Sequence, residues 1–323
     1  MAALRVACVG SGSIAARHLD AVAGLPEVEI VGVASRIEAH AAALASRFGA
    51  PAFASFQAML EKARPDALFI CVAPAAHGEI ERAALERGIP FLVEKPLAHS
   101  WEIAEEVGRA VKERGLVTAV GYQWRYLSTV ERAQALLQGR RVALAQGYWM
   151  STTPPPRWWG RQEESGGQMV EQTTHLFDLA RLFLGEPESV YAVGARVTRA
   201  SHPELNVDAV SSALVRFAGG GIASFNSACI ATPQYRIGLH LLTEGMELEI
   251  SAASLVVVTA RERTEIRSEG DATVLQDADF LDAVRTRNPA AVRSPYSDAL
   301  RSHGLAVRAQ ESAVRGEPIV VAG

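Results

Sequence analysis

A glycine-rich segment near the N-terminus restricts the possible folds more than any other feature of the sequence. Residues 10–15 read GSGSIA, between an apolar run, Leu4–Val9, that predicts a β-strand and a helical pattern through His18 and Val22. Glycine allows a tight turn and a close approach of the backbone, and the start of the following helix offers free N–H groups. In this context the G-x-G-x-x-A pattern predicts a βαβ unit that binds the pyrophosphate of a dinucleotide. The residues expected to contact it are Gly10, Ser11, Gly12, Ser13 and Ile14.

The residues after the second predicted strand, Val28–Ala34, bear on the choice of dinucleotide. Where an acidic residue would bind the 2′-hydroxyl of NAD, this chain has Ser35 followed by Arg36. A hydroxyl and a guanidinium both donate hydrogen bonds and suit a 2′-phosphate, so NADP is predicted, with NAD as the alternative. Ser35 and Glu38 also form the pattern of a capping box at the start of a helix, and the two interpretations are compatible.

Apolar strand runs and helices continue to alternate up to Gly121. This alternation predicts a doubly wound parallel sheet, and ligands of such sheets bind beyond the carboxyl ends of the strands. Residues that follow the predicted strands should therefore line one crevice together with the glycine-rich turn. The further candidates for dinucleotide contacts are Ala73, Pro74, His77, Glu94, Lys95 and Gln123.

The pattern changes from Tyr122 onward, where several strand-like runs between Val190 and Ser268 are separated by tight-turn signals. The chain is therefore predicted to be α/β with two domains. Residues 1–120 form a dinucleotide-binding Rossmann domain, and residues 121–323 form an α+β domain for substrate binding and oligomerisation, with a large, mainly antiparallel open sheet. The apolar surface of such a sheet needs a cover, so a homodimer or homotetramer through this sheet is expected.

The segment from Ser165 to Gly185 contains the strongest candidates for acid–base chemistry. Glu171, His175 and Asp178 are spaced so that an α-helix would align them along one face. Polar groups among apolar neighbours cost free energy unless they are paired or functional. The alternative interpretation is a capped helix whose histidine is a satisfied core residue.

A proline- and tryptophan-rich segment, Thr152–Trp159, is predicted to be a loop, because three prolines exclude a helix or a central strand. Its adjacent aromatic rings would either form a stacking surface for a sugar or seal the junction between the domains. Other aromatic residues and one cation follow the last strand of the first domain. The candidate substrate contacts are Tyr122, Arg125, Trp158, Trp159 and Asp178.

Composition argues against several classes of function. With 32 basic and 36 acidic residues the formal net charge is −4, which provides no field for nucleic acid or an anionic membrane. The 3 cysteines form no C-x-x-C pair, so neither a disulfide scaffold nor a metal site is expected. No apolar run approaches the ~20 residues that span a bilayer, and the first strand begins at once. We therefore expect a cytoplasmic protein that binds neither membranes nor nucleic acid.

Several ordered motifs resemble those of the Gfo/Idh/MocA oxidoreductases over nearly the whole chain. They are GSGSIA at residues 10–15, VAPAAH at residues 72–77, EKP at residues 94–96, the glycine-pair helix with His175 and Asp178, and ESAVRGEPIVV close to the C-terminus. The resemblance implies a Rossmann domain joined to an α/β domain. It also implies hydride transfer between a nicotinamide and a hydroxyl-bearing carbon of a sugar or polyol.

The resemblance also implies roles for individual residues. Lys95 would contact the substrate hydroxyl, His175 would be the general base in oxidation or the acid in reduction, and Asp178 would be a supporting carboxylate. The residue types agree with this chemistry, because an alcohol must lose its proton as hydride leaves and an ammonium stabilises the developing alkoxide. Lysine is rare in this chain, where only Lys62, Lys95 and Lys112 occur.

The chain departs from the family pattern next to the histidine. Where the family has D-x-G-x-H, residues 171–175 read EQTTH, so the acid is one methylene longer and a threonine replaces the glycine. Glu171 is the third catalytic candidate and is expected to orient His175 or to hold a substrate hydroxyl. The change bears on the role of the acid and on the size of the substrate more than on hydride transfer.

Three functions are compatible with these residues. The first is an NAD(P)-dependent oxidoreductase that acts on a hydroxyl or carbonyl carbon of a sugar, polyol or related small molecule. The second is a redox-neutral glycosidase or lyase of the same family, which keeps its nicotinamide bound and recycles it. The third is a non-enzymatic sensor of a dinucleotide or sugar. The joint presence of Lys95, His175 and an acidic residue favours the first.

Overall fold

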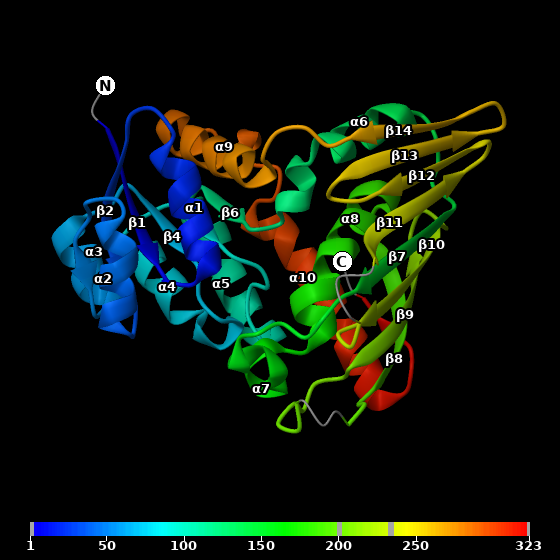
Figure 1. The fold of residues 1–323 in the computed structure, drawn as a ribbon, viewed down its shortest axis with the longest axis horizontal. Helices are drawn as coiled ribbons and strands as arrows, with labels where there is room; N and C mark the ends of the chain where they lie inside the picture. The colour runs from blue at the N-terminus through cyan, green and yellow to red at the C-terminus, as the bar shows by residue number, and fades with distance from the viewer. Residues whose placement is uncertain (1–2, 199–201, 232–235, 322–323) are drawn as a thin grey trace. The chain divides into compact units, whose positions relative to one another are not determined.

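A computed structural model describes residues 3–198, 202–231 and 236–321 of the chain. The chain divides into two compact units, and Figure 1 shows the elements of both. The first unit comprises Met1–Ala98, Glu102–Gln123 and Asp271–Leu300. The second comprises His99–Trp101, Trp124–Gly270 and Arg301–Gly323.

The first unit is built on a parallel sheet of 6 strands in the order β3-β2-β1-β4-β5-β6 (Figure 1). The strands are β1 (Leu4–Val9), β2 (Val28–Ala34), β3 (Ala52–Phe53), β4 (Ala67–Ile70), β5 (Phe91–Val93) and β6 (Thr118–Val120). The strand order reverses beside β1, which is the topological switch point of a doubly wound fold. The predicted Rossmann architecture is confirmed.

Both faces of this sheet are covered by helices. Along β1, Val6 and Cys8 belong to one apolar layer, whereas Ala7 and Val9 belong to the other. This arrangement explains why the strands read as continuous apolar runs rather than as alternating ones. The helices that pack on the sheet are α1 (Ser13–Ala23), α2 (Glu38–Ser46), α3 (Phe56–Ala63), α4 (Glu79–Glu86), α5 (Trp101–Arg114) and α9 (Ala272–Thr286).

Helix α9 belongs to the first unit although it lies far along the chain. Phe280 and Leu281 are buried in the same apolar layer as Leu19 of α1, and the Phe280 ring meets Phe69 of β4 edge to face at 5.6 Å. The prediction of one boundary after residue 120 did not include this return. Helical periodicity shows which face of a helix is buried, but it does not show which sheet covers that face.

The second unit contains a sheet of 9 strands in the order β14-β13-β12-β11-β7-β10-β9-β8-β15. Only the β7–β10 pair is parallel among these neighbours, so the predicted mainly antiparallel sheet is confirmed. The strands are β7 (Leu144–Met150), β8 (Pro187–Ala195), β9 (Val210–Phe217), β10 (Ile222–Ala228), β11 (Arg236–Thr243), β12 (Met246–Ile250), β13 (Ser254–Thr259), β14 (Arg263–Arg267) and β15 (Ile319–Val320).

One face of this second sheet carries the apolar core, and helices cover it (Figure 1). The helices of this unit are α6 (Ser128–Leu137), α7 (Gln162–Ser165), α8 (Thr174–Leu184) and the larger part of α10 (Tyr296–Arg315). The opposite face exposes several large apolar side chains, namely Tyr191, Val193, Leu214, Ile222 and Val320. None of the helices in the described ranges has the length and hydrophobicity needed to cross a membrane.

Candidate active site

The glycine-rich turn between β1 and α1 has the shape of an anion-binding loop. Gly10 has a φ of +124°, and a Cβ built there would overlap the carbonyl oxygen of Cys71, so only glycine fits. Gly12 is the N-cap of α1, and a Cβ built there would meet nothing within 4 Å. The first turn of α1 contains no acidic residue, so no carboxylate of that turn neutralises the positive end of the helix. This turn fits the pyrophosphate of a dinucleotide.

Ser35 and Arg36 follow the carboxyl end of β2. The hydroxyl of Ser11 donates to Ser35 Oγ at 2.8 Å, which places two hydroxyl groups beside the glycine-rich turn, while the Arg36 side chain is exposed. The predicted capping box is wrong, because α2 begins only at Glu38, with Ile37 as its N-cap and no side-chain cap. The Ser35 hydroxyl accepts hydrogen bonds from the Ser11 hydroxyl and, at 3.4 Å, from the backbone N–H of Ile37.

Other predicted dinucleotide contacts also follow strands of the first unit. Beyond β4 a 3-10 turn, Pro74–Ala76, has Ala73 as its N-cap and leads to His77. The Nδ1 atom of His77 lies 2.6 Å from Glu81 Oε1, whereas its buried Nε2 atom has no partner among the described residues. The buried Oε1 atom of Gln123, beyond β6, likewise has no partner in the described part of the chain. Buried polar atoms are normally paired, so these two atoms fit a polar ligand.

The Glu94-Lys95-Pro96 segment follows β5 at the same edge of the parallel sheet. Glu94 is buried, and its carboxylate lies so close to Gly121 that a Cβ there would overlap it. Lys95 is half-buried, and the Lys95–Pro96 peptide bond is cis. Because the carboxyl ends of parallel strands lie at one edge of a sheet, Lys95 and the glycine-rich turn share that edge.

In the second unit, His175 lies buried in the first turn of α8. Its ring is nearly parallel to the Trp149 ring, with centroids 5.4 Å apart and an angle of 10°. The Trp124 ring lies 6.4 Å from His175 at 28°. Both arrangements are offset stacks that restrict rotation of the imidazole. Trp149 was not among the residues predicted from the sequence, although the buried alternation of Ala145 and Gly147 in β7 shows which side of that strand faces the helices.

The helix that carries His175 does not begin as a regular α-helix. A π-helical turn, Met169–Thr173, precedes α8. Glu171 therefore lies in a wider π turn and not in the regular α-helix from which its alignment with His175 and Asp178 was predicted. His175 and Asp178 remain one turn apart within α8.

The tryptophan-rich segment packs within the second unit. Trp159 is fully buried in a small apolar cluster with Val207, Ala209 and Cys229, and Trp158 packs against this cluster. The indole N–H of Trp159 donates to Glu171 Oε2 at 2.7 Å. Packing and support of Glu171 therefore account for Trp159, whereas Trp158 keeps part of its surface exposed.

Arg125 and Asp178, which were predicted to contact substrate, pair with each other. The Nε and Nη2 atoms of Arg125 donate to the two carboxylate oxygens of Asp178 at 2.7 and 2.6 Å, and the side chains are only 7% and 1% exposed. Ser302 donates to Asp178 Oδ1 at 2.6 Å. These hydrogen bonds offset the cost of burying the pair. The pair thus supports α8 one turn beyond His175.

Tyr122 also differs from its predicted place. It was predicted to contact substrate because it follows β6, but its side chain has no exposed surface and packs in an apolar layer of the first unit. A strand end marks the edge of the sheet, yet it does not decide whether a ring turns toward the ligand or toward the core. Within the described ranges, no group of His, Cys, Asp and Glu side chains is arranged to hold a metal ion.

The two units correspond to two domains that occur together in one group of enzymes. Residues 4–122 match the oxidoreductase family with an NAD-binding Rossmann fold, and residues 139–254 match the GFO/IDH/MocA C-terminal domain. The class of the protein is thereby defined as an NAD(P)-dependent oxidoreductase. More narrowly, the chain belongs to the Gfo/Idh/MocA family, as the motifs of the sequence indicate.

Individual relatives are similar over most of the chain. The chain is 27% identical over 291 residues to D-xylose 1-dehydrogenase (NADP(+)) 2 of Haloferax volcanii. The aligned region covers 88% of this chain and 87% of that protein. It is 26% identical over 263 residues to inositol 2-dehydrogenase of Rubrobacter xylanophilus, with 79% and 73% covered. A levoglucosan dehydrogenase solved with NADH and levoglucosan has a TM-score of 0.89 at 20% identity, covering 99% of this chain and 100% of that chain. This last likeness concerns the fold.

Proposed function

We propose that this oxidoreductase transfers a hydride between NADP and a hydroxyl or carbonyl carbon of a carbohydrate-like small molecule. The observation that carries the proposal is His175, a buried imidazole held against the Trp149 ring, in a chain whose other unit has an open dinucleotide turn. The two named relatives identified by sequence are dehydrogenases of a sugar and of an inositol, which supports this substrate class. They also favour hydride transfer over the redox-neutral and sensor alternatives.

The roles of the side chains follow from the balance of charge in the reaction. A nicotinamide, when bound, would accept or supply the hydride. His175 takes the hydroxyl proton during oxidation and returns it during reduction. The Lys95 ammonium stabilises the negative charge that develops on the substrate oxygen. The stacked Trp149 ring restricts the plane in which the imidazole lies.

The remaining candidates have supporting roles in this proposal. Glu171, held by the Trp159 indole N–H, is the third catalytic group and binds a substrate hydroxyl. Arg125 and Asp178 position α8 and thereby His175. The glycine-rich turn would hold the dinucleotide together with the buried His77 Nε2 and Gln123 Oε1 atoms, which have no partner among the residues that the structure describes.

A turnover screen tests the proposed function. The purified protein is incubated with NADPH and a panel of ketoses and aldoses, and with NADP and a panel of sugars, polyols and aldonates, while the absorbance of the reduced nicotinamide is followed. We expect turnover with at least one member of a panel. Intact cofactor binding without any turnover contradicts the proposal, and cleavage of glycosides without a net change of cofactor supports the redox-neutral alternative.

The preference for NADP is tested at Arg36. Replacing this exposed guanidinium in Arg36→Ala removes charge-assisted hydrogen bonds to a 2′-phosphate, each of which contributes about 1.5–3 kcal/mol. We therefore expect the Kd for NADPH to rise about tenfold or more, while the Kd for NADH stays within about twofold. Arg47→Ala is the matched control, because Arg47 is an exposed cation of the same unit that pairs with Asp20. Calorimetric titration that finds equal losses for both cofactors contradicts the assignment.

We further propose that two copies of the chain associate through the open sheet, as a homodimer or as the building block of a homotetramer. Val193, Leu214 and Ile222 are 48%, 60% and 50% exposed on the outer face of three adjacent strands. Leu214→Glu introduces a charge into this apolar surface and is expected to shift the protein to monomers in sedimentation velocity. Leu275→Glu is the control on α9, where an exposed leucine lies outside this sheet. A wild-type protein that is monomeric at micromolar concentration contradicts the proposal.

A cytoplasmic location completes the proposal. Cys8, Cys71 and Cys229 are buried and form no disulfide among the described residues, which supports a reducing compartment. Cell fractionation followed by detection of the full-length chain tests this location, and recovery from an oxidising compartment contradicts it.

A further inference from the structure

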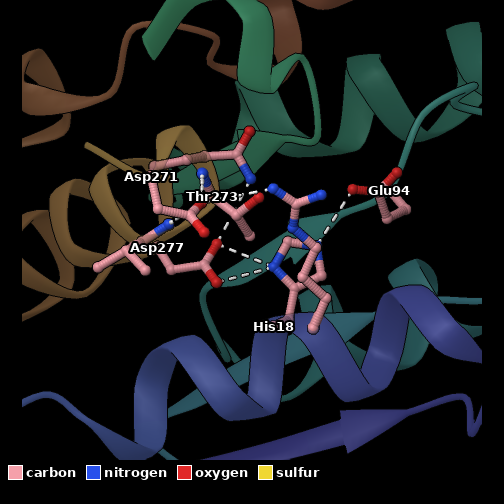
Figure 2. A network of polar contacts seen from close by, with 8 residues as sticks. His18, Glu94, Asp271, Thr273 and Asp277 are labelled. Carbon is pink, nitrogen blue, oxygen red and sulfur yellow. Dashed lines mark hydrogen bonds and ion pairs between the residues drawn. The ribbon is translucent and has the colours of Figure 1, made fainter. Parts of the chain in front are cut away.

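A buried histidine that has no part in the proposed chemistry connects three distant segments of the first unit. The Nδ1 atom of His18 in α1 lies 2.9 and 2.8 Å from the two carboxylate oxygens of Asp277 in α9, and its Nε2 atom lies 3.1 Å from Glu94 Oε1. Figure 2 shows the imidazole between the two carboxylates. The side chains of His18, Asp277 and Glu94 are 1%, 0% and 8% exposed.

The imidazole carries a positive charge in this setting. Burial by itself lowers the pKa of His18, but Asp277 and then Glu94 more than offset this effect and raise the pKa to about 10. Both ring nitrogens face carboxylate oxygens, and only the imidazolium form donates a hydrogen bond from each nitrogen. One positive charge therefore lies between two carboxylates, away from solvent.

The groups around this cluster come from several elements. Gln276 of α9 donates to Asp277 Oδ1 at 3.4 Å, and burial raises the pKa of Asp277. The Cys71 thiol follows β4, and its hydrogen bond with Cys8 and its burial raise its pKa well above the usual value. At the surface of the same two helices, Arg17 and Asp271 form a half-exposed ion pair at 3.4 Å. Lys95 directly follows Glu94 in the chain.

Glu94 is held from two sides and by its backbone. His18 contacts Oε1, Gly121 leaves just enough room for the carboxylate, and the Glu94 backbone N–H donates to Ile70 O at 2.9 Å. Because Glu94 directly precedes Lys95, a Glu94 side chain that is fixed in this way restricts the backbone from which Lys95 projects.

We propose that His18 is a positioning residue, which Asp277 holds as an imidazolium and which anchors Glu94 so that Lys95 keeps one orientation. His18 lies on the helix that begins at the glycine-rich turn, so the same helix would bind the dinucleotide and hold the reacting lysine in place. The inference rests on the proposed role of Lys95. Without the imidazolium, two buried carboxylates would face each other, and Glu94 would take up a proton or move away.

The small number of lysines permits a direct test. Reductive methylation with labelled formaldehyde gives one NMR signal each for Lys62, Lys95 and Lys112, which Lys→Arg variants assign. In His18→Gln we expect the Lys95 signal to shift and its titration midpoint to change, while the other two lysine signals stay in place. Arg17→Gln is the matched control, because it removes the surface contact between the same two helices, and all three signals should stay unchanged.

Kinetics and stability complete the test. We expect His18→Gln to lower kcat about tenfold or more while the KM for NADPH stays within about twofold, since the dinucleotide turn itself is unchanged. Asp277→Asn should shift the Lys95 signal in the same way, and this variant serves if His18→Gln fails to fold. A folded His18→Gln protein with an unchanged Lys95 signal overturns the positioning role. A wild-type protein without turnover, but with a Lys95 signal that depends on His18, contradicts the proposed function instead.

The pH dependence of unfolding provides a readout that needs no substrate. The folded-state pKa of His18 is raised from 6.5 to about 10, so the stabilisation from its charge is fully present below pH 6.5 and is lost as the pH rises through about 10. The Tm of the wild type should therefore fall more steeply over this range than the Tm of His18→Gln. Parallel curves contradict a charged His18.

Discussion

Replacing His175 with asparagine is expected to lower kcat by about 10²–10⁴-fold, the usual contribution of a positioned general acid–base group. Asparagine keeps a polar side chain in the first turn of α8 but cannot take up a proton at neutral pH. The Kd for NADPH should stay within about twofold, because the glycine-rich turn belongs to the other unit. Steady-state kinetics and calorimetric titration of the same preparation measure the two quantities.

The control for this variant is His240→Asn. His240 belongs to the same unit but lies on β11, outside the helix that carries His175. Its Nε2 atom is 2.9 Å from Glu249 Oε1. We expect wild-type turnover from this control. A His175→Asn protein that retains more than about a tenth of the wild-type kcat would remove His175 from the proton-transfer role and return it to the alternative of a satisfied core histidine.

Alanine substitutions at two glycines of the same turn are expected to have different effects: Gly10→Ala lowers the Tm, whereas Gly12→Ala weakens the binding of NADPH. In Gly10→Ala the new Cβ overlaps the Cys71 carbonyl oxygen, and a φ of +124° is strained for any residue with a side chain. Cys71 cannot move away easily, because its own N–H donates to Val9 O at 2.8 Å within the sheet. We expect a destabilisation of about 3 kcal/mol or more, seen as a Tm lowered by roughly 5–10 °C.

In Gly12→Ala the new Cβ meets nothing within 4 Å, so the folded protein accommodates it. We expect a Tm within about 4 °C of the wild type, because alanine is less favourable than glycine at an N-cap by only about 1 kcal/mol, and the extended Gly12 backbone (φ −80°) is open to alanine. The methyl group would instead occupy the open space over the start of α1 and weaken NADPH binding about 100-fold or more. Thermal unfolding and calorimetric titration of both variants separate the two effects.

A stability loss in Gly10→Ala and a binding loss in Gly12→Ala are together the result expected for a loop that binds the pyrophosphate. If Gly12→Ala binds NADPH as tightly as the wild type, the open space at the start of α1 is not the pyrophosphate site. If Gly10→Ala has an unchanged Tm, the Cys71 carbonyl does not pack against Gly10 closely enough to exclude a side chain. Either result would contradict the account of the first unit.

Local patterns in the sequence were sufficient for the architecture. The run of alternating strands and helices after GSGSIA predicted the parallel sheet, because both faces of such a sheet are buried and its strands are apolar throughout. The tight-turn signals between Val190 and Ser268 predicted an antiparallel sheet. The ordered motifs, among them the segment with Lys95 and the helix with His175, were sufficient for the family.

Contacts between distant residues were not predictable from those patterns. Trp149 stacks on His175, Arg125 donates to both carboxylate oxygens of Asp178, and the Trp159 indole donates to Glu171. Each of these contacts depends on how helices, strands and loops pack against one another. The sequence around a single residue does not show which other element will pack against it. A tertiary contact therefore decided whether each polar residue faces a ligand or another side chain.

By itself, the sequence determined the two sheets, the dinucleotide turn and the family, because strand and helix periods and glycine backbone requirements are local properties of the chain. Only the tertiary structure decided that α9 returns to the first unit and brings Asp277 to His18 and Glu94. The physical reason is that a buried charge is tolerated only beside its partner. The packing of α1 against α9 supplies that partner, because it brings together His18 and Asp277, which are 259 residues apart in the chain.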